Sequence, residues 1–152
     1  MNRPESDEDR AKTLLAEQNF PAAVVAGLIA AALAGIAYGI VVYKWPFSYG
    51  FAAAGVGMFV GFWMQFLGRG IDLKFGVAAG VFTVGGILLG KLTLAVIHLA
   101  PARVSSMFDV FTNDKLTWAY MEQYLTISLI ELVYWFVAVF AAVFLSKRAL
   151  SR

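Results

Sequence analysis

Two ionisable side chains stand inside long apolar stretches of this sequence, where water is scarce. Lys91 lies in the third such stretch and Glu131 in the fourth. Charged side chains inside a membrane are costly, and they usually face a partner or a water-filled cavity. A carboxylate beside an ammonium group forms an ion pair, and the same carboxylate can bind a proton or another cation. These two residues are therefore the first candidates for chemistry.

Matched depth predicts that the two charges meet. At 1.5 Å per helical residue, Lys91 lies roughly 22 Å from Gly76, and Glu131 lies roughly 21 Å from Leu145. Gly76 and Leu145 are expected at the same, inner side of a hydrocarbon core about 30 Å thick, which places both charges in its outer half. We therefore expect an ion pair between the last two membrane helices.

Neighbouring polar residues extend this candidate polar centre toward the outer surface. His98 follows Lys91 by two helical turns, and Tyr124 and Ser128 share a face with Glu131. Two interpretations stay open. In one, the ion pair only fixes how the fourth helix docks on the third. In the other, Glu131 is a proton or cation site that Lys91 releases when substrate binds.

Other kinds of site find no support in the sequence. The absence of cysteine excludes disulfides and thiolate ligands, and a single histidine argues against a transition-metal site. There is no Ser/His/Asp arrangement and no phosphate-binding glycine motif. We expect no catalytic site, no metal and no cofactor. If the chain were an enzyme acting on lipid, Ser128 would be the only nucleophile near the polar centre.

Four apolar runs predict an all-α polytopic membrane protein. Of the 152 residues, 61% are hydrophobic and only 14% are charged. Each run reaches the roughly 20 residues that cross a bilayer as a helix, and helices satisfy their own backbone groups in lipid. The expected fold is an antiparallel four-helix bundle over residues 20–146, with short first and second loops. The spans are about 21–43, 47–67, 75–100 and 125–145.

Basic residues predict the orientation. Arg69 and Lys74, the segment 1–19 and the basic tail 147–152 fall on one side, and few basic residues fall on the other. By the positive-inside rule both termini are cytoplasmic, and the longer loop 101–124 lies outside. We expect an interfacial helix or re-entrant segment in that loop.

Two smaller expectations concern the inner side. Arg69 and Lys74 either bind an anionic lipid head group or a partner, or form a solvated turn that sets the topology. The N-terminal segment lacks the basic start of a signal peptide, so the first apolar run is expected to be retained as a span. The stretch 9–18 is expected to form a brief amphipathic helix.

Small residues recur at helical spacing and predict close helix packing. They predict a tight hairpin of the second and third spans with the first span against it, or alternatively a homodimer through one stripe. The fourth span lacks glycine, so we expect it to pack less closely and to face lipid. The stripes are Gly35 and Gly39; Gly57 and Gly61; and Gly76, Gly86 and Gly90.

Several short motifs of this chain resemble motifs that occur together in a known group of proteins. The motifs are EQNFP at 17–21, GRGID at 68–72, KFG at 74–76 and GILLG at 86–90. Together they resemble a family of small multi-span bacterial inner-membrane proteins that has no assigned activity. The resemblance implies a bacterial inner membrane. It also implies an acidic residue near Glu131 and, more often, an amide where Lys91 stands.

The sequence favours one function class and keeps a second. We expect a non-enzymatic membrane protein that assembles with itself or with a membrane protein partner through its glycine faces, in contact with membrane lipid. The alternative is a small ion- or proton-coupled transporter or channel that uses Glu131 and Lys91. The net charge of +2 gives no reason to expect a nucleic acid partner.

Overall fold

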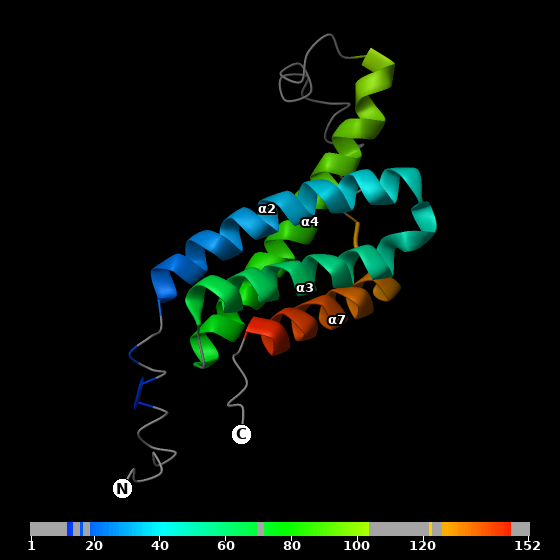
Figure 1. Cartoon of the computed structure of the whole chain (residues 1–152). Coiled ribbons are helices and arrows are strands. Elements are labelled where there is room, and N and C mark those ends of the chain that lie inside the picture. The colour runs from blue at the N-terminus through cyan, green and yellow to red at the C-terminus, as the bar shows by residue number, and fades with distance from the viewer. Residues whose placement is uncertain are drawn as a thin grey trace, which may run out of the picture.

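The computed structural model contains four long helices (Figure 1). It describes residues 12, 13, 16, 19–69, 72–103, 122 and 126–146. The helices are α2 (Phe20–Lys44), α3 (Tyr49–Gly68), α4 (Leu73–Arg103) and α7 (Leu129–Ser146), with a 3₁₀ turn, η1 (Pro46–Ser48), between the first two. All four are long and apolar enough to cross a membrane, α4 through its portion Leu73–His98. The predicted all-α, four-span fold is therefore confirmed.

Two helix boundaries differ from the prediction. The third span was expected to end at Ala100, but α4 continues through Pro101 to Arg103. Proline removes only one backbone donor, and the helix ends within a turn of it. The fourth span was expected to start near residue 125, but α7 begins at Leu129. The apolar run therefore begins before the helix does.

The helices form a four-membered ring. α2 packs against α3 and α4, and α7 packs against the same two helices from the other side. α2 and α7 are therefore at opposite corners, and α3 and α4 face one another across the shorter diagonal. Since successive spans reverse direction, α2 runs parallel to α4 and α3 runs parallel to α7. The expected hairpin of the second and third spans is present, with Gly86 of α4 facing Val56 and Gly68 of α3 facing Phe75. Other glycines of these spans pack elsewhere: Gly57 and Gly61 face α7, and Gly90 faces α2.

Glycines bring the two parallel pairs into backbone contact. A Cβ atom on Gly39 would lie 2.6 Å from the carbonyl oxygen of Gly90, and one on Gly35 would overlap the carbonyl oxygen of Gly86. Between α3 and α7, a Cβ on Gly57 would overlap the carbonyl oxygen of Ala138. Side chains at these positions would push the helices apart. These stripes therefore serve packing within the chain.

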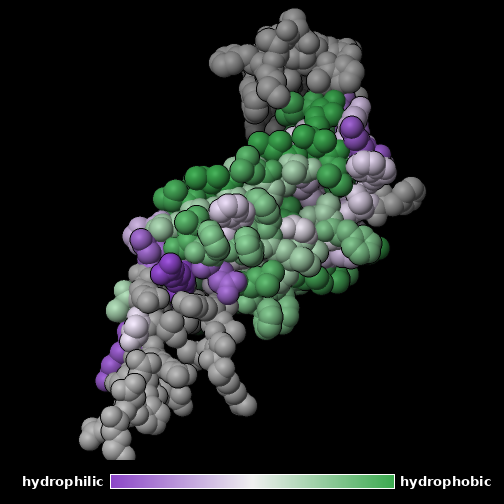
Figure 2. All heavy atoms as spheres, in the orientation of Figure 1, coloured by the Kyte–Doolittle hydropathy of each residue, from purple (hydrophilic) through white to green (hydrophobic). Residues whose placement is uncertain are grey.

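The last helix combines close packing with wide exposure. Ala138 and Ala142 are fully buried against Gly57 and Gly61, so the expectation of loose packing is wrong. Alanine, like glycine, lets two backbones approach closely. The expected lipid exposure is present on the opposite face, where several large side chains are exposed: Leu129, Ile130, Phe136, Phe140 and Phe144. Figure 2 shows hydrophobic residues along the helices and hydrophilic ones toward the ends.

The end of the bundle at which α2 begins is held together by residues of the EQNFP, GRGID and KFG motifs. Asn19 caps α2 by accepting a hydrogen bond from the Ala22 N–H at 3.1 Å, and its own N–H donates to the Gly68 carbonyl at 3.0 Å. Phe20 meets Phe75 edge to face, with ring centroids 5.3 Å apart. The start of α2 is therefore fixed to the end of α3 and to the start of α4.

Candidate functional site

Lys91 and Glu131 meet between α4 and α7. The Nζ atom of Lys91 lies 2.6 Å from Oε2 of Glu131, a short charge-assisted hydrogen bond. The Lys91 side chain is 4% exposed and that of Glu131 is 20% exposed. The ion pair expected from matched depth is thus present, and it is nearly removed from the surface.

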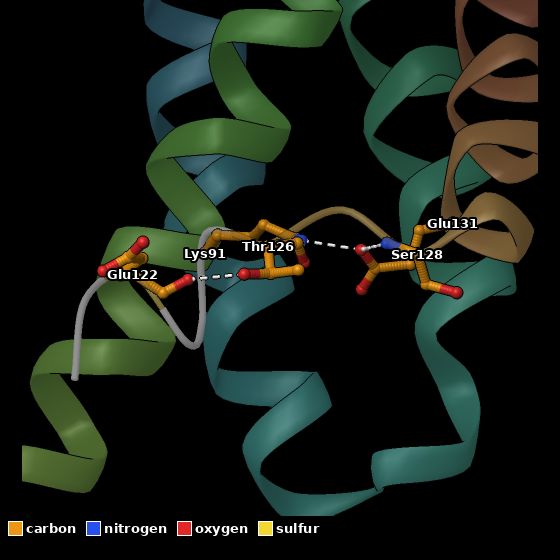
Figure 3. A network of polar contacts seen from close by, with 5 residues as sticks. All are labelled: Lys91, Glu122, Thr126, Ser128 and Glu131. Atoms are coloured by element: carbon orange, nitrogen blue, oxygen red, sulfur yellow. Dashed lines mark hydrogen bonds and ion pairs between the residues drawn. The ribbon is translucent and has the colours of Figure 1, made fainter. Parts of the chain in front are cut away.

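A second acceptor and an aromatic ring complete the surroundings of the ammonium group. Lys91 Nζ also donates to the carbonyl oxygen of Thr126 at 3.2 Å (Figure 3). The same nitrogen lies 5.9 Å from the centre of the Trp135 ring, within the range of a cation–π contact. The positive charge is therefore held by a carboxylate, a carbonyl and a ring.

Local structure at the start of α7 positions Glu131. Oε2 of Glu131 accepts a hydrogen bond from the backbone N–H of Ser128 at 3.3 Å, in front of the first turn of the helix. The Ser128 carbonyl accepts the first helical bond, from Leu132 N–H at 3.0 Å. Ser-Leu-Ile-Glu is the sequence of a capping box. This capping box was not predicted from the sequence, because the apolar run continues upstream of Ser128.

The turn before α7 positions the second acceptor. Both the backbone N–H and the hydroxyl of Thr126 donate to the carbonyl of Glu122, at 3.0 and 2.7 Å. The residues between Thr126 and Leu129 are not helical. The Thr126 carbonyl is therefore free of helical bonding and can accept from Lys91. This contact was not predicted, because no side-chain pattern marks a backbone acceptor.

Helix packing places the polar centre near the end of the bundle at which α2 ends. Lys91 follows Gly90, which packs on Gly35 and against the ring of Tyr38. The Gly90 oxygen is level with Gly39, five residues before the end of α2, or roughly 7 Å along the axis. Tyr38 is buried and lies within electrostatic range of Glu131. The polar centre thus lies toward the end of the bundle at which α2 ends and α7 begins.

The rest of the predicted polar seam is divided. His98 has its Nδ1 atom 3.0 Å from the Leu94 carbonyl and its ring against Tyr43 of α2, with centroids 5.0 Å apart. These contacts turn the imidazole toward α2, whereas Glu131 lies on α7. Ser128 joins the centre through its backbone N–H. Tyr124 and the rest of the predicted outer-loop helix lie outside the described residues.

The inner-loop candidates have contacts within the chain. Lys74 pairs with Asp72 at 3.0 Å and lies 5.8 Å and 5.7 Å from the ring centres of Phe20 and Phe75. Arg69 adopts the left-handed conformation, with φ 47°, and its N–H caps α3 by donating to the Gln65 carbonyl. Both residues therefore help to shape the turn between α3 and α4.

Two grooves open on opposite sides of the ring, and both are apolar. One, of about 400 Å³, lies between α4 and α7 and includes Gly76, Gly80 and Val139. The other, also of about 400 Å³, lies between α2 and α3 and includes Tyr38 and Gly55. Neither of these two grooves is lined by Lys91 or Glu131.

The arrangement can bind a cation or exchange a proton at one carboxylate. Among the described residues, no group of three or more His, Cys, Asp or Glu side chains gathers as a metal site would need. Comparison of the chain with models of protein families, with curated proteins and with solved structures finds no match.

Proposed function

We propose that this chain is a non-enzymatic membrane protein that assembles with itself or with another membrane protein. The observation that carries the proposal is where the small residues lie. The Gly35–Gly39 and Gly57–Gly61 stripes are filled by other helices of the same chain. The partner surface is therefore assigned to the large side chains that face lipid and not, as the sequence suggested, to the glycine faces.

Stacked phenylalanines on α3 and α7 are the best candidates for that surface. Phe62 and Phe66 stack at 6.1 Å, and Phe140 and Phe144 stack at 6.5 Å. All four side chains are more than half exposed. Stacking pre-orders these rings, so less side-chain entropy is lost when a second helix packs on them. Packing of ordered side chains is a main source of helix association in lipid.

The test is to measure the mass of the protein in mild detergent and to identify what copurifies. Replacing Phe62, Phe66, Phe140 and Phe144 by alanine should reduce the complex to a monomer. The matched control replaces four exposed residues of α2 by alanine, namely Val25, Leu28, Ile36 and Ile40. A monomeric wild type without a copurifying membrane protein would refute the proposal, as would equal behaviour of the two variants.

A second candidate function is cation or proton transport through Glu131. The observation that favours it is the retained exposure of this carboxylate, 20%, beside a nearly buried ammonium group. Intramembrane carboxylates often mark ion pathways. Vesicles containing the protein should then pass a proton or small cation, and Glu131→Gln should abolish the flux. Equal flux in empty vesicles would remove this candidate.

We further propose a bacterial inner membrane with both termini cytoplasmic. The support is the distribution of basic residues and the resemblance of the EQNFP, GRGID and KFG motifs. Reporter domains fused after Arg152 and inserted after Lys44 should report opposite sides. If both reporters were active on the same side, the four-span topology would be wrong.

A further inference from the structure

Among the described residues, the groups that hold the Lys91 ammonium come from one short stretch of chain. Its two oxygen acceptors are Glu131 Oε2 at 2.6 Å and the Thr126 carbonyl at 3.2 Å, and the ring is that of Trp135. None of them belongs to α4. Residues 126–135 therefore form the receptor for a cation, and α4 supplies the cation that occupies it.

The receptor is shaped by bonds that do not involve Lys91. The Ser128 N–H fixes the carboxylate of Glu131, and two bonds to the Glu122 carbonyl fix Thr126. A site whose groups are held by their own neighbours keeps its geometry when the ligand leaves. We therefore expect the carboxylate, the carbonyl and the ring to stay in place without the lysine side chain.

The chemistry of the site selects a primary ammonium group. The carboxylate and the carbonyl both accept hydrogen bonds from one nitrogen, so the ligand must carry at least two N–H donors. The Trp135 ring adds an attraction for positive charge on the remaining side. Hard metal cations prefer six or more oxygen ligands, and among the described residues two oxygens converge here.

We propose that residues 126–135 form a binding site for a primary alkylammonium group, and that Lys91 occupies this site as a tethered ligand. The tether gives Lys91 a high effective concentration, so free amines bind when its amino group is removed or displaced. This inference names a ligand class for the second candidate function and rests on the same ion pair. It does not depend on transport or on assembly.

The test restores the missing part of the side chain as a free molecule. Lys91→Ala removes the atoms of n-propylammonium, and the melting temperature of this variant in detergent should rise with n-propylammonium concentration and reach a plateau. Tetramethylammonium has no N–H donor and should bind about tenfold more weakly or worse. The wild type, with its site filled, should not respond at the concentrations that saturate the variant.

Two controls separate the site from a general effect of amines. The double variant Lys91→Ala/Glu131→Gln should show no plateau with n-propylammonium. If Lys91→Ala does not fold, Lys91→Met keeps a stem of the same length and lacks only the nitrogen, and ammonium becomes the probe. A linear response without a plateau, equal effects of tetramethylammonium, or an unchanged response in the double variant would each overturn the site. An absence of ion flux in vesicles would refute the transport function but would not overturn this binding site. The two proposals can therefore fail separately.

Discussion

At the scale of single residues, the two charges of the polar centre are not equivalent. Glu131 has the Ser128 N–H as a second partner, lies in the first turn of α7 and keeps 20% of its side chain exposed. The positive end of the helix dipole stabilises a carboxylate there. Lys91 is 4% exposed, and its strongest partner is Glu131. Without Glu131, the Lys91 ammonium would lose its strongest partner while still buried. Without Lys91, the Glu131 carboxylate would keep the Ser128 N–H bond, the helix dipole and contact with solvent.

This asymmetry predicts unequal costs for breaking the pair. Glu131→Gln leaves a buried ammonium without its counter-charge and should destabilise the protein by about 3 kcal/mol. Lys91→Met leaves a capped, partly exposed carboxylate and should cost about 1–2 kcal/mol. Both values are read from reversible denaturation in detergent at neutral pH.

The double variant is the control for this comparison. Lys91→Met/Glu131→Gln removes both charges, so it should recover much of the stability lost in Glu131→Gln. Equal costs for the two single variants, or strictly additive costs in the double variant, would show that the pair does not act as described.

Sequence alone predicted the pair but not its full surroundings. Depth along two helices needs only the rise per residue, which made Lys91 and Glu131 predictable partners. The Ser128–Glu131 capping box was also readable, since its spacing is local. The contact between Lys91 and the Thr126 carbonyl could not be predicted, because every residue carries the same backbone acceptor. The contact of His98 with Tyr43 of α2 was also not predicted, because a shared helical face is wide enough to contact two different neighbours.

At the scale of helices, the lengths of α2 and α3 and the contacts between successive spans were predictable, whereas the contact partners of the individual glycines and the close packing of α3 on α7 were not. The thickness of the bilayer fixes the length of each span, so the boundaries of α2 and α3 agree with the sequence within two residues. Small-residue stripes carry no such information about partners, since any glycine face fits any other. The pairing of Gly57 with Ala138 also requires alanine on the partner helix, which a search for glycines overlooks.

The glycine contacts predict opposite effects of alanine on one helix. In Gly57→Ala the new methyl group would overlap the Ala138 carbonyl, and overpacking should cost about 1–3 kcal/mol. In Gly55→Ala the new methyl group meets nothing within 4 Å. That variant should be neutral or more stable by up to about 1 kcal/mol, because alanine favours helix. Thermal unfolding in detergent compares the two; similar losses would contradict the close α3–α7 contact.

The N-cap of α2 predicts a smaller loss of stability than the contact of Gly57 does. Asn19→Ala removes the oxygen that accepts the Ala22 N–H and should cost about 1 kcal/mol. Asn19→Asp keeps an acceptor and is the matched control, expected to stay close to wild type. Since the Asn19 N–H bond to Gly68 uses the backbone, neither change removes it. Denaturation midpoints measure the difference, and a neutral Asn19→Ala would exclude the cap as a stabilising contact.

At the scale of the whole molecule, the ring order decides what each helix can contact. α4 touches α2 through Gly86 and Gly90, and it touches α7 through Gly80 and Lys91. α4 therefore links two helices that lie at opposite corners. The ion pair holds α4 and α7 together near the start of α7, and an apolar groove that includes Gly80 and Val139 lies between the two helices further along α7.

The ring order predicts which cysteine pairs can be cross-linked. The chain has no cysteine of its own, so engineered pairs report without background. A Cβ on Gly80 would lie 3.3 Å from Cγ1 of Val139, so the pair Gly80→Cys/Val139→Cys should form a disulfide readily in membranes. In the control pair Leu33→Cys/Val139→Cys, the two residues line grooves on opposite sides of the ring, so that pair should stay reduced. Efficient cross-linking of the control pair within one chain would place α2 beside α7, and the arrangement that brings Lys91 to Glu131 would then need a different fold.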